Sequence, residues 1–279
     1  MTEGDPTDDD PRDEAPAERA HRTEPDLERE NRQLQRRLQR LEDNVRTLEA
    51  FQDSNATLLS RLLKDLEEER ERSHRLLLNV LPQRIIDRLG AGETVIADRH
   101  DDVTVLLGDL VGFTRISAEL EPSALVEALD NLFSTFDAIC AETAVEKIKT
   151  VGDAYLVVGG LPGGAPDHAA AIAETALRMT EAVAGRNDDA WAIRIGITRG
   201  PIVAGVIGSS KFAYDVWGDT VNLASRLQGA ASPGAIVVGG SLADSLGEAF
   251  ALEPLGAIDL KGKGPTPAWS LRRAVGRPL

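Results

Sequence analysis

Hydrophobic residues recur every three or four positions along the N-terminal part of the chain, in one register that runs unbroken from Leu27 to Val80. The d positions are Leu27, Leu34, Leu41, Leu48, Asn55, Leu62, Glu69 and Leu76, and the a positions are Asn31, Leu38, Val45, Gln52, Leu59, Leu66, Ser73 and Val80. A sustained heptad repeat predicts a coiled coil over residues 27–80. Arg37 at a g position would face Glu42 at an e position of a second helix, which favours a parallel dimer. The alternative is a single amphipathic helix packed on a globular domain, although such a helix usually has a wider apolar stripe.

Two segments flank this repeat. Residues 1–26 are rich in Asp, Glu, Pro and Ala, so we expect a disordered acidic leader, which is either simply solvated or an interaction tail for a regulatory protein. The coiled coil offers such a partner a second surface. Residues 81–98 contain Pro82 as their second residue, which should interrupt the helix. A short amphipathic stretch then contains Leu81, Ile85, Ile86 and Leu89. We expect this segment to couple the coiled coil to the domain that follows.

From residue 99 to residue 279, short apolar runs typical of strands alternate with longer helical patterns. The predicted strands cover 103–110, 145–152, 153–161, 191–198, 202–209 and 235–240, and the predicted helices cover 122–142, 167–184 and 219–231, the last with Asp219 as its N-cap. We interpret 145–161 as one hairpin, 191–209 as a second, and the stretch around 261–265 as a third. This order favours an α+β domain with a mixed or antiparallel sheet and helices on its faces.

Composition narrows the functional classes. The formal net charge of −15 argues against general nucleic-acid binding, which needs a basic surface, but not against a nucleotide bound through metal ions. The single cysteine, Cys140, excludes an intrachain disulfide. No apolar run approaches the ~20 residues of a membrane span, and the acidic N-terminus lacks the features of a signal peptide. We therefore expect a soluble, cytoplasmic protein.

Two aspartates are candidate metal ligands. Asp109 ends the first predicted strand, and Asp153 lies at the bend of the first hairpin. If these elements are neighbours in the sheet, the two carboxylates can converge on magnesium ions that also bind a triphosphate. The backbone amides of the turn Gly112, Phe113 and Thr114 could bind phosphate oxygens. Taken singly, each aspartate would more often be an ordinary turn or capping residue.

Four stretches together carry a resemblance to a known family. GDLVGFTRIS, EKIKTVGDAYLVVGGLP, YDVWGDTVNLASRL and LKGKG are similar, in order and approximate spacing, to the catalytic domain of class III nucleotidyl cyclases, over about residues 99–274. The resemblance implies a ferredoxin-like class III cyclase homology domain, with a mostly antiparallel central sheet and flanking helices. The preceding helix and its LLLNVLP segment resemble the signalling helix and transducer element that often precede such domains.

The resemblance also assigns roles to individual residues. Asp109 and Asp153 match the pair that binds two Mg²⁺ or Mn²⁺ ions in each active site. Lys149 and Asp215 match the residues that read the purine; guanylyl cyclases carry Glu and typically Cys there, so Lys with Asp suits adenine. Asn222 and Arg226 match the pair that orients the ribose and stabilises the transition state. Lys261, with Lys263 as second choice, matches the lysine that contacts the terminal phosphates.

The implied activity is conversion of ATP to 3′,5′-cyclic AMP and pyrophosphate by a homodimer whose catalytic domains pair head to tail. The chain carries both halves of the site, so the dimer would contain two complete sites, and the coiled coil would transmit or fix its geometry. One alternative is a guanylate or promiscuous cyclase. Two others, from different classes, are a catalytically degenerate cyclase-like dimerisation module and a coiled-coil scaffold that only binds nucleotide.

Overall fold

The computed structural model describes residues 24–185, 191–208 and 211–274, and divides the chain after Leu76 into two compact units. Most of the predicted acidic leader lies outside these residues. Its last positions do not: the first helix, α1, begins at Glu24 and continues for 55 residues to Leu78. The helix thus begins three residues before the predicted coiled-coil segment, residues 27–80.

The heptad seam of α1 is exposed along its length. Leu34, Leu41 and Leu48 each keep more than half of their surface accessible in the single chain. An exposed apolar stripe of this length is typical of a surface that a partner helix covers. The coiled coil itself stays a prediction.

Pro82 interrupts the helix as predicted. α1 ends at Leu78, and α2 runs from Gln83 to Gly90 with Pro82 as its N-cap residue. Leu81 and Ile85 belong to the second unit and are buried among its apolar residues. The segment predicted to couple the helix to the domain is thus anchored in the domain core.

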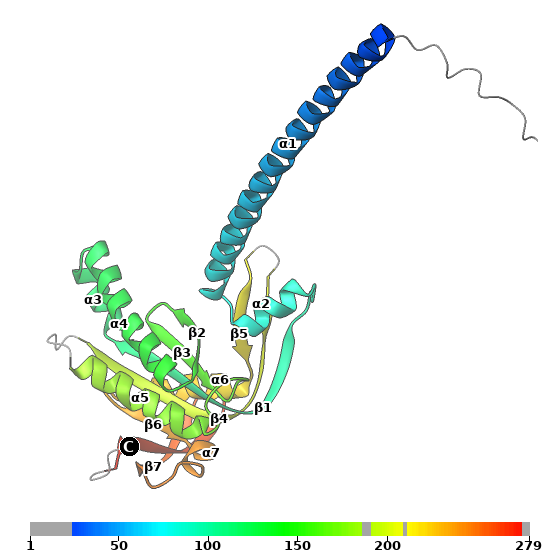
Figure 1. Cartoon of the computed structure of the whole chain (residues 1–279). Helices are drawn as coiled ribbons and strands as arrows, with labels where there is room; N and C mark the ends of the chain where they lie inside the picture. The colour runs from blue at the N-terminus through cyan, green and yellow to red at the C-terminus, as the bar shows by residue number, and fades with distance from the viewer. Residues whose placement is uncertain (1–23, 186–190, 209–210, 275–279) are drawn as a thin grey trace, which may run out of the picture. The chain divides into compact units, whose positions relative to one another are not determined.

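The domain contains a mixed sheet of eight strands (Figure 1). Its first part comprises β1 (Ala97–Val111), α3 (Phe113–Glu119), α4 (Pro122–Glu142), β2 (Glu146–Val151), β3 (Ala154–Gly159), α5 (His168–Ala184) and β4 (Ala192–Ile207). These strands lie in the order β2-β3-β1-β4, which with the two crossover helices is the ferredoxin-like arrangement. The expected fold class is confirmed, and the predicted hairpin at 145–161 is found as β2 and β3.

The rest of the chain extends this sheet. It comprises β5 (Ala213–Trp217), α6 (Asp219–Ala230), β6 (Ile236–Gly239), α7 (Gly240–Ala243), β7 (Phe250–Leu260) and β8 (Gly264–Arg273). β5 pairs with β4, and the order continues from β4 through β6 and β8 to β7. Among the described strands, β4 and β6 are the one parallel pair, so the sheet is mostly antiparallel.

The predicted hairpin at 191–209 was wrong, because β4 is one continuous strand of 16 residues. The Gly200-Pro201 pair reads as a turn in sequence but lies extended in the structure. It stands opposite the irregularity in β1 between His100 and Val103. Pro201 has no amide N–H to donate, and at this irregular point the pairing of β1 with β4 continues without that hydrogen bond. The true hairpin is formed by β4 and β5.

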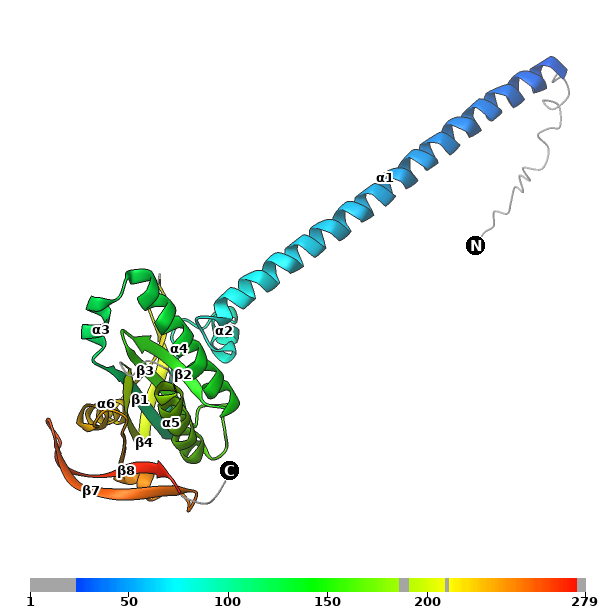
Figure 2. The same cartoon turned by 90° about the vertical axis from the view of Figure 1, so that its left-hand side faces the viewer.

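Alternate residues of β4 face opposite sides of the sheet, and Figure 2 shows α4 and α5 next to each other on one of these sides. Ile193, Ile195 and Ile197 are buried in the main core, with residues of α4 and α5. On the opposite side, Gly196 lies directly beneath the backbone of α6, where an added Cβ would stand 2.2 Å from the Ala224 carbonyl oxygen. The missing side chain of Gly196 therefore lets α6 lie close to the sheet.

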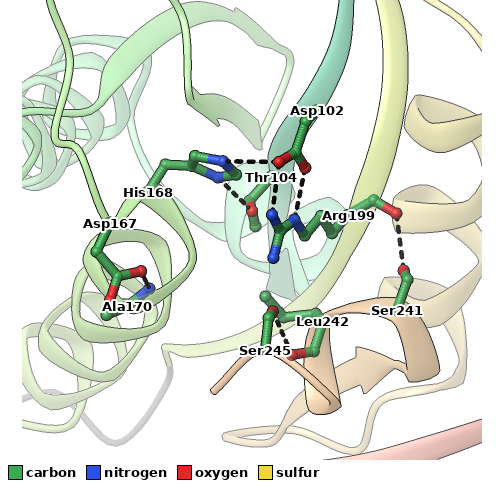
Figure 3. Close-up of polar contacts among 9 residues, drawn as sticks. All are labelled: Asp102, Thr104, Asp167, His168, Ala170, Arg199, Ser241, Leu242 and Ser245. Carbon is green, nitrogen blue, oxygen red and sulfur yellow. Dashed lines mark hydrogen bonds and ion pairs between the residues drawn. The ribbon is translucent and has the colours of Figure 1, made fainter. Parts of the chain in front are cut away.

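A polar cluster joins β1, β4 and α5 away from the predicted site residues (Figure 3). Arg199 donates two hydrogen bonds, of 2.6 and 2.5 Å, to the carboxylate of Asp102. His168 lies beside them, with its Nδ1 2.9 Å from the Thr104 hydroxyl and its Nε2 3.8 Å from Asp102. The pKa of Asp102 is lowered, chiefly by the hydrogen bonds from Arg199. This cluster fastens the irregular part of β1 to its neighbours.

Candidate active site

The two predicted metal ligands are neighbours across the β1–β3 ladder. Asp109 pairs with Ala154, the residue after Asp153. Gly152 has a φ of 63° and provides the left-handed residue that the tight β2–β3 turn requires. The turn thereby brings Asp153 beside Asp109, as the sequence predicted.

The negative charges of the two carboxylates repel each other. The pKa of Asp153 is raised, first by burial and also by the negative charge of nearby Asp109. Arg194 offsets part of that charge, with its Nη2 2.7 Å and its Nε 3.0 Å from Asp109 Oδ2. Gln228 donates a further hydrogen bond of 3.2 Å to the same oxygen. Two crowded carboxylates with a single basic partner favour a bound cation.

The donor set fits a hard divalent ion. Mg²⁺ and Mn²⁺ prefer oxygen ligands, and nucleotide sites commonly hold them with one or two carboxylates plus water and substrate phosphates. Asp109 and Asp153 supply two such groups. No cluster of three or more His, Cys, Asp or Glu side chains suited to a metal occurs in the described part of the chain.

Sequence reasoning missed Arg194 and Gln228. A signal for Arg194 was available, because it is a charged residue between Ile193 and Ile195 in an apolar part of the strand. Such a residue needs a buried or half-buried acidic partner. Gln228 gave no comparable signal, because a glutamine late in a helix is usually solvated.

The turn after β1 has the predicted form. Gly112 has a φ of 75° and is the N-cap residue of α3. The amides of Arg115 and Ile116 bond to the Gly112 carbonyl, so the earlier amides, of Gly112, Phe113 and Thr114, belong to the open first turn. These are the groups expected to bind phosphate.

Lys149 and Asp215 form an ion pair, with 2.5 Å between Nζ and Oδ2. Lys149 comes from β2 and Asp215 from β5, strands that are not adjacent in the sheet. The Asp215 side chain is mostly buried, and its Oδ1 also accepts a hydrogen bond from the Val216 amide. The structure thus brings together the two residues predicted to read the purine.

The remaining site residues lie on α6 or close to it. Asn222 and Arg226 lie one helical turn apart on it. Arg226 reaches the turn between β7 and β8, where its Nη2 is 3.8 Å from the position of a Cβ on Gly262, next to Lys261. Lys263 pairs with Asp219, which leaves Lys261 as the better candidate for a phosphate. The predicted N-cap was wrong, because Gly218 caps α6 and Asp219 is its first residue.

Comparison with known proteins shows the family of the chain. Residues 95–273 match the family described as the adenylate and guanylate cyclase catalytic domain. The chain belongs to this class III cyclase family. It is 44% identical to an adenylate cyclase of Mycobacterium tuberculosis over 210 residues, which is 74% of this chain and 47% of the relative. It is 37% identical to human atrial natriuretic peptide receptor 2 over 247 residues, 85% of this chain and 24% of the receptor. The cyclase chain thus spans less than half the length of these curated relatives.

Solved structures of both substrate types resemble the cyclase domain. The guanylate cyclase domain of RhGC from Catenaria anguillulae, in complex with GTP, is 33% identical with a TM-score of 0.61, and the match covers 63% of this chain and 99% of that one. The adenylyl cyclase CyaB from P. aeruginosa is 26% identical with a TM-score of 0.58, covering 64% and 97%. Since relatives of both kinds occur, nucleotide specificity must be argued from the residues of this cyclase.

None of the helices in the described ranges combines the length and hydrophobicity that crossing a bilayer requires.

Proposed function

We propose that this cyclase converts ATP to 3′,5′-cyclic AMP and pyrophosphate. The observation that carries the choice of ATP is the ion pair between Lys149 and Asp215. An ammonium group can donate to N1 of adenine, and a carboxylate can accept from its 6-amino group, whereas guanine presents the reverse pattern. Because an ammonium has three donors, Lys149 can keep Asp215 as a partner while it binds the base.

The other residues divide the remaining work. Asp109 and Asp153 hold two Mg²⁺ or Mn²⁺ ions, which when bound would neutralise the triphosphate and make the ribose 3′-hydroxyl more acidic. Arg226 stabilises negative charge as pyrophosphate leaves, and Asn222 orients the ribose. The terminal phosphates contact Lys261 and the amides of the Gly112–Thr114 turn. Positioning and charge stabilisation are the main contributions expected in phosphoryl transfer.

We further propose that the active form is a homodimer. In this arrangement the metal ligands of one protomer face the purine pair, Asn222 and Arg226 of the other, head to tail. The exposed heptad seam of α1 supports a parallel two-fold pair. The coiled coil would then fix or transmit the dimer geometry.

The test is to incubate the purified full chain with Mn²⁺ and either ATP or GTP and identify the cyclic product. We expect cyclic AMP as the main product, and no product from Asp109→Ala or Asp153→Ala. Asp130→Ala, which removes an exposed carboxylate from α4, is the matched control and should retain activity. Cyclic GMP as the main product would favour the guanylate alternative, and no product at all would favour a binding or dimerisation module.

Complementation tests the shared site. Asp109→Ala and Arg226→Ala disable opposite halves, so each alone should be inactive, while a mixture should regain one intact site in each heterodimer. Failure of the exchanged mixture to recover activity would overturn the proposal that sites are shared between protomers.

A further inference from the structure

Arg84, on α2, connects the transducer segment to both strands of the purine pair. Its Nη1 and Nη2 donate hydrogen bonds of 2.7 and 2.8 Å to the two carboxylate oxygens of Glu146. Nη2 also donates a bond of 2.6 Å to the Tyr214 hydroxyl, and the guanidinium lies 5.5 Å from the centre of that ring. α2 lies beside β5 in Figure 1.

The two partners of Arg84 stand close to the two purine residues. Glu146 begins β2, three positions before Lys149, and Tyr214 immediately precedes Asp215 on β5. No backbone ladder of the described sheet joins β2 to β5, because β3, β1 and β4 lie between them. The distance between Lys149 and Asp215 therefore depends on side-chain contacts, and the Arg84 contacts span the same two strands.

The surroundings make this bridge stronger than a surface ion pair. The Arg84 and Glu146 side chains are 28% and 23% exposed, and Tyr214 is buried. Bidentate guanidinium–carboxylate geometry gives directional bonds that a lysine cannot reproduce. Burial raises the pKa of Tyr214 to about 12, so its hydroxyl stays protonated and can accept from Arg84 at every working pH.

The chain just before α2 borders a cavity next to the purine pair. Residues 78–82 line a cavity of about 670 Å³ whose other walls include Lys149, Thr150 and Tyr214. Leu81 lies in one apolar cluster with Tyr214 and Val216 of β5, and Ile148 of β2 packs against that cluster. Arg84 crosses from α2 to β2 and β5, while Leu81 and Ile85 anchor α2 in the core.

From this geometry we infer that Arg84 is a positioning residue for nucleobase recognition. It holds β2 and β5 at the separation that lets Lys149 and Asp215 contact one purine, and it links the position of α2 to base selectivity. This inference rests on the proposed function. It assigns Arg84 no contact with the nucleotide.

A matched control lies one helical turn away. Arg88 also anchors α2, but its guanidinium bonds to Glu93, at 2.7 and 2.6 Å, and to Asp98 at the start of β1. Arg84→Ala and Arg88→Ala therefore each remove a bidentate ion pair from the same helix. Only Arg84→Ala removes a polar link between β2 and β5, where the Lys149–Asp215 ion pair remains.

Kinetics with Mn-ATP and Mn-GTP give the first readout. For Arg84→Ala we expect KM for ATP to rise about tenfold and the ratio of kcat/KM for ATP over GTP to fall, with a smaller change in kcat. Arg84→Lys should give an intermediate ratio, and Arg88→Ala should keep the wild-type ratio. An unchanged ATP/GTP ratio and KM in Arg84→Ala, or the same losses in Arg88→Ala, would overturn the inference.

Hydrogen exchange without nucleotide separates this inference from the proposed function. Arg84→Ala should increase amide exchange in residues 146–151 and 213–217, whereas Arg88→Ala should leave those strands protected as in the wild type. Unchanged exchange in Arg84→Ala would refute the bridge even in an active enzyme. If Arg84→Ala exchanges faster but the wild-type protein forms no cyclic product, the bridge holds the two strands and the proposed function is refuted. The role of the bridge in base recognition is then refuted with it.

Discussion

Lys147 and Lys149 stand two positions apart on β2 and bind different carboxylates. Lys147 donates a 2.6 Å hydrogen bond to Asp137 of α4, and its ammonium lies 5.0 Å from the centre of the Tyr155 ring. Lys149 pairs with Asp215 on β5. A shift in register between the two lysines accompanies this divergence. One lysine therefore fastens a helix to the sheet, while the other is available to a ligand.

The purine pair gives the first prediction. Replacing Lys149 with Glu and Asp215 with Cys removes the donor for N1 of adenine and the acceptor for its amino group, and provides an acceptor for guanine instead. We expect the ratio of kcat/KM for ATP over GTP to fall by more than ~10-fold, which corresponds to about 1.4 kcal/mol. The measurement is the initial rate with each nucleotide. Lys147→Glu is the control on the same strand, and an equal change in its ratio would contradict the assignment of Lys149.

Asp102 gives a prediction about pH. Because Arg199 lowers the pKa of Asp102 below its usual value of 3.8, the contribution to stability is complete above about pH 4 and is lost as the pH falls through the lower folded-state value. Asp102→Asn should reduce the free energy of unfolding by up to ~1 kcal/mol from pH 5 to pH 8, since the pair is half exposed. The difference from wild type should shrink toward pH 3.

Urea unfolding at several pH values measures this effect. The control is Asp101→Asn, whose carboxylate pairs with Arg99 on the open surface and should contribute almost nothing. A deficit in Asp102→Asn that stays the same at pH 3 and pH 7 would show that the ion pair is not its cause.

Individual site residues were predictable only where a motif placed them. Asp109, Asp153, Lys149 and Asp215 were assigned from the sequence, and the structure brings them together as two pairs. Lys147 received no role from the sequence, because a partner on α4 cannot be inferred from spacing along β2. Arg194 and Gln228 were missed as well: both bond to Asp109, a residue far away in sequence, and only Arg194 gave a signal, as a charged residue between two buried isoleucines.

At the scale of elements, the contact of α6 with β4 determines where Asn222 and Arg226 stand. Gly196 permits that contact, since a Cβ there would meet the backbone of Ala224 and Gln228 at 2.2 Å. No side-chain rotation can relieve a clash with backbone atoms. The position of the predicted catalytic pair, Asn222 and Arg226, therefore depends on one missing methyl group.

Gly196→Ala should accordingly push α6 away from the sheet. We expect a loss of ~1–3 kcal/mol or more in the free energy of unfolding, as for other overpacked cores, together with a decrease in kcat. Gly229→Ala on α6 itself, where a Cβ meets nothing within 4 Å, should instead be neutral or stabilising by up to ~1 kcal/mol. Urea denaturation and initial rates measure both effects, and equal stability of the two variants would refute this role of Gly196.

The pattern of elements was largely readable from the sequence. Helix 122–142 was predicted with its observed bounds, and the β2–β3 hairpin followed from alternation around a Gly-Asp turn. The error at 191–209 arose because Gly and Pro usually mark turns. Here Pro201 instead accompanies a bulge in the neighbouring strand, and only the pairing partner reveals that compensation.

At the scale of the whole molecule, the heptad repeat indicates a parallel dimer. In such a pair each d residue faces its own copy, within reach of a disulfide. Leu41→Cys should therefore form a covalent dimer under mild oxidation, seen on a non-reducing gel. Asp43→Cys, on the outer face two residues later, should not. The native Cys140 should not interfere, because it is buried and burial raises the pKa of its thiol to about 12.

Equal cross-linking at positions 41 and 43 would indicate random collision, and none at position 41 would contradict an in-register parallel pair. Assembly was the property least accessible from one chain, since the seam leucines of α1 have no partner to contact within it. The repeat predicts that they are covered, but only a second molecule can cover them.

The short hairpin of β2 and β3 has a consequence for how two active sites would behave together. Lys149 and Asp153 stand four positions apart in the sequence, one in the purine pair and one in the metal pair. In the proposed two-fold assembly these residues serve opposite sites. Nucleotide bound at one site would then constrain the same rigid hairpin that completes the other, so occupancy of the two sites should be cooperative, with a Hill coefficient different from one.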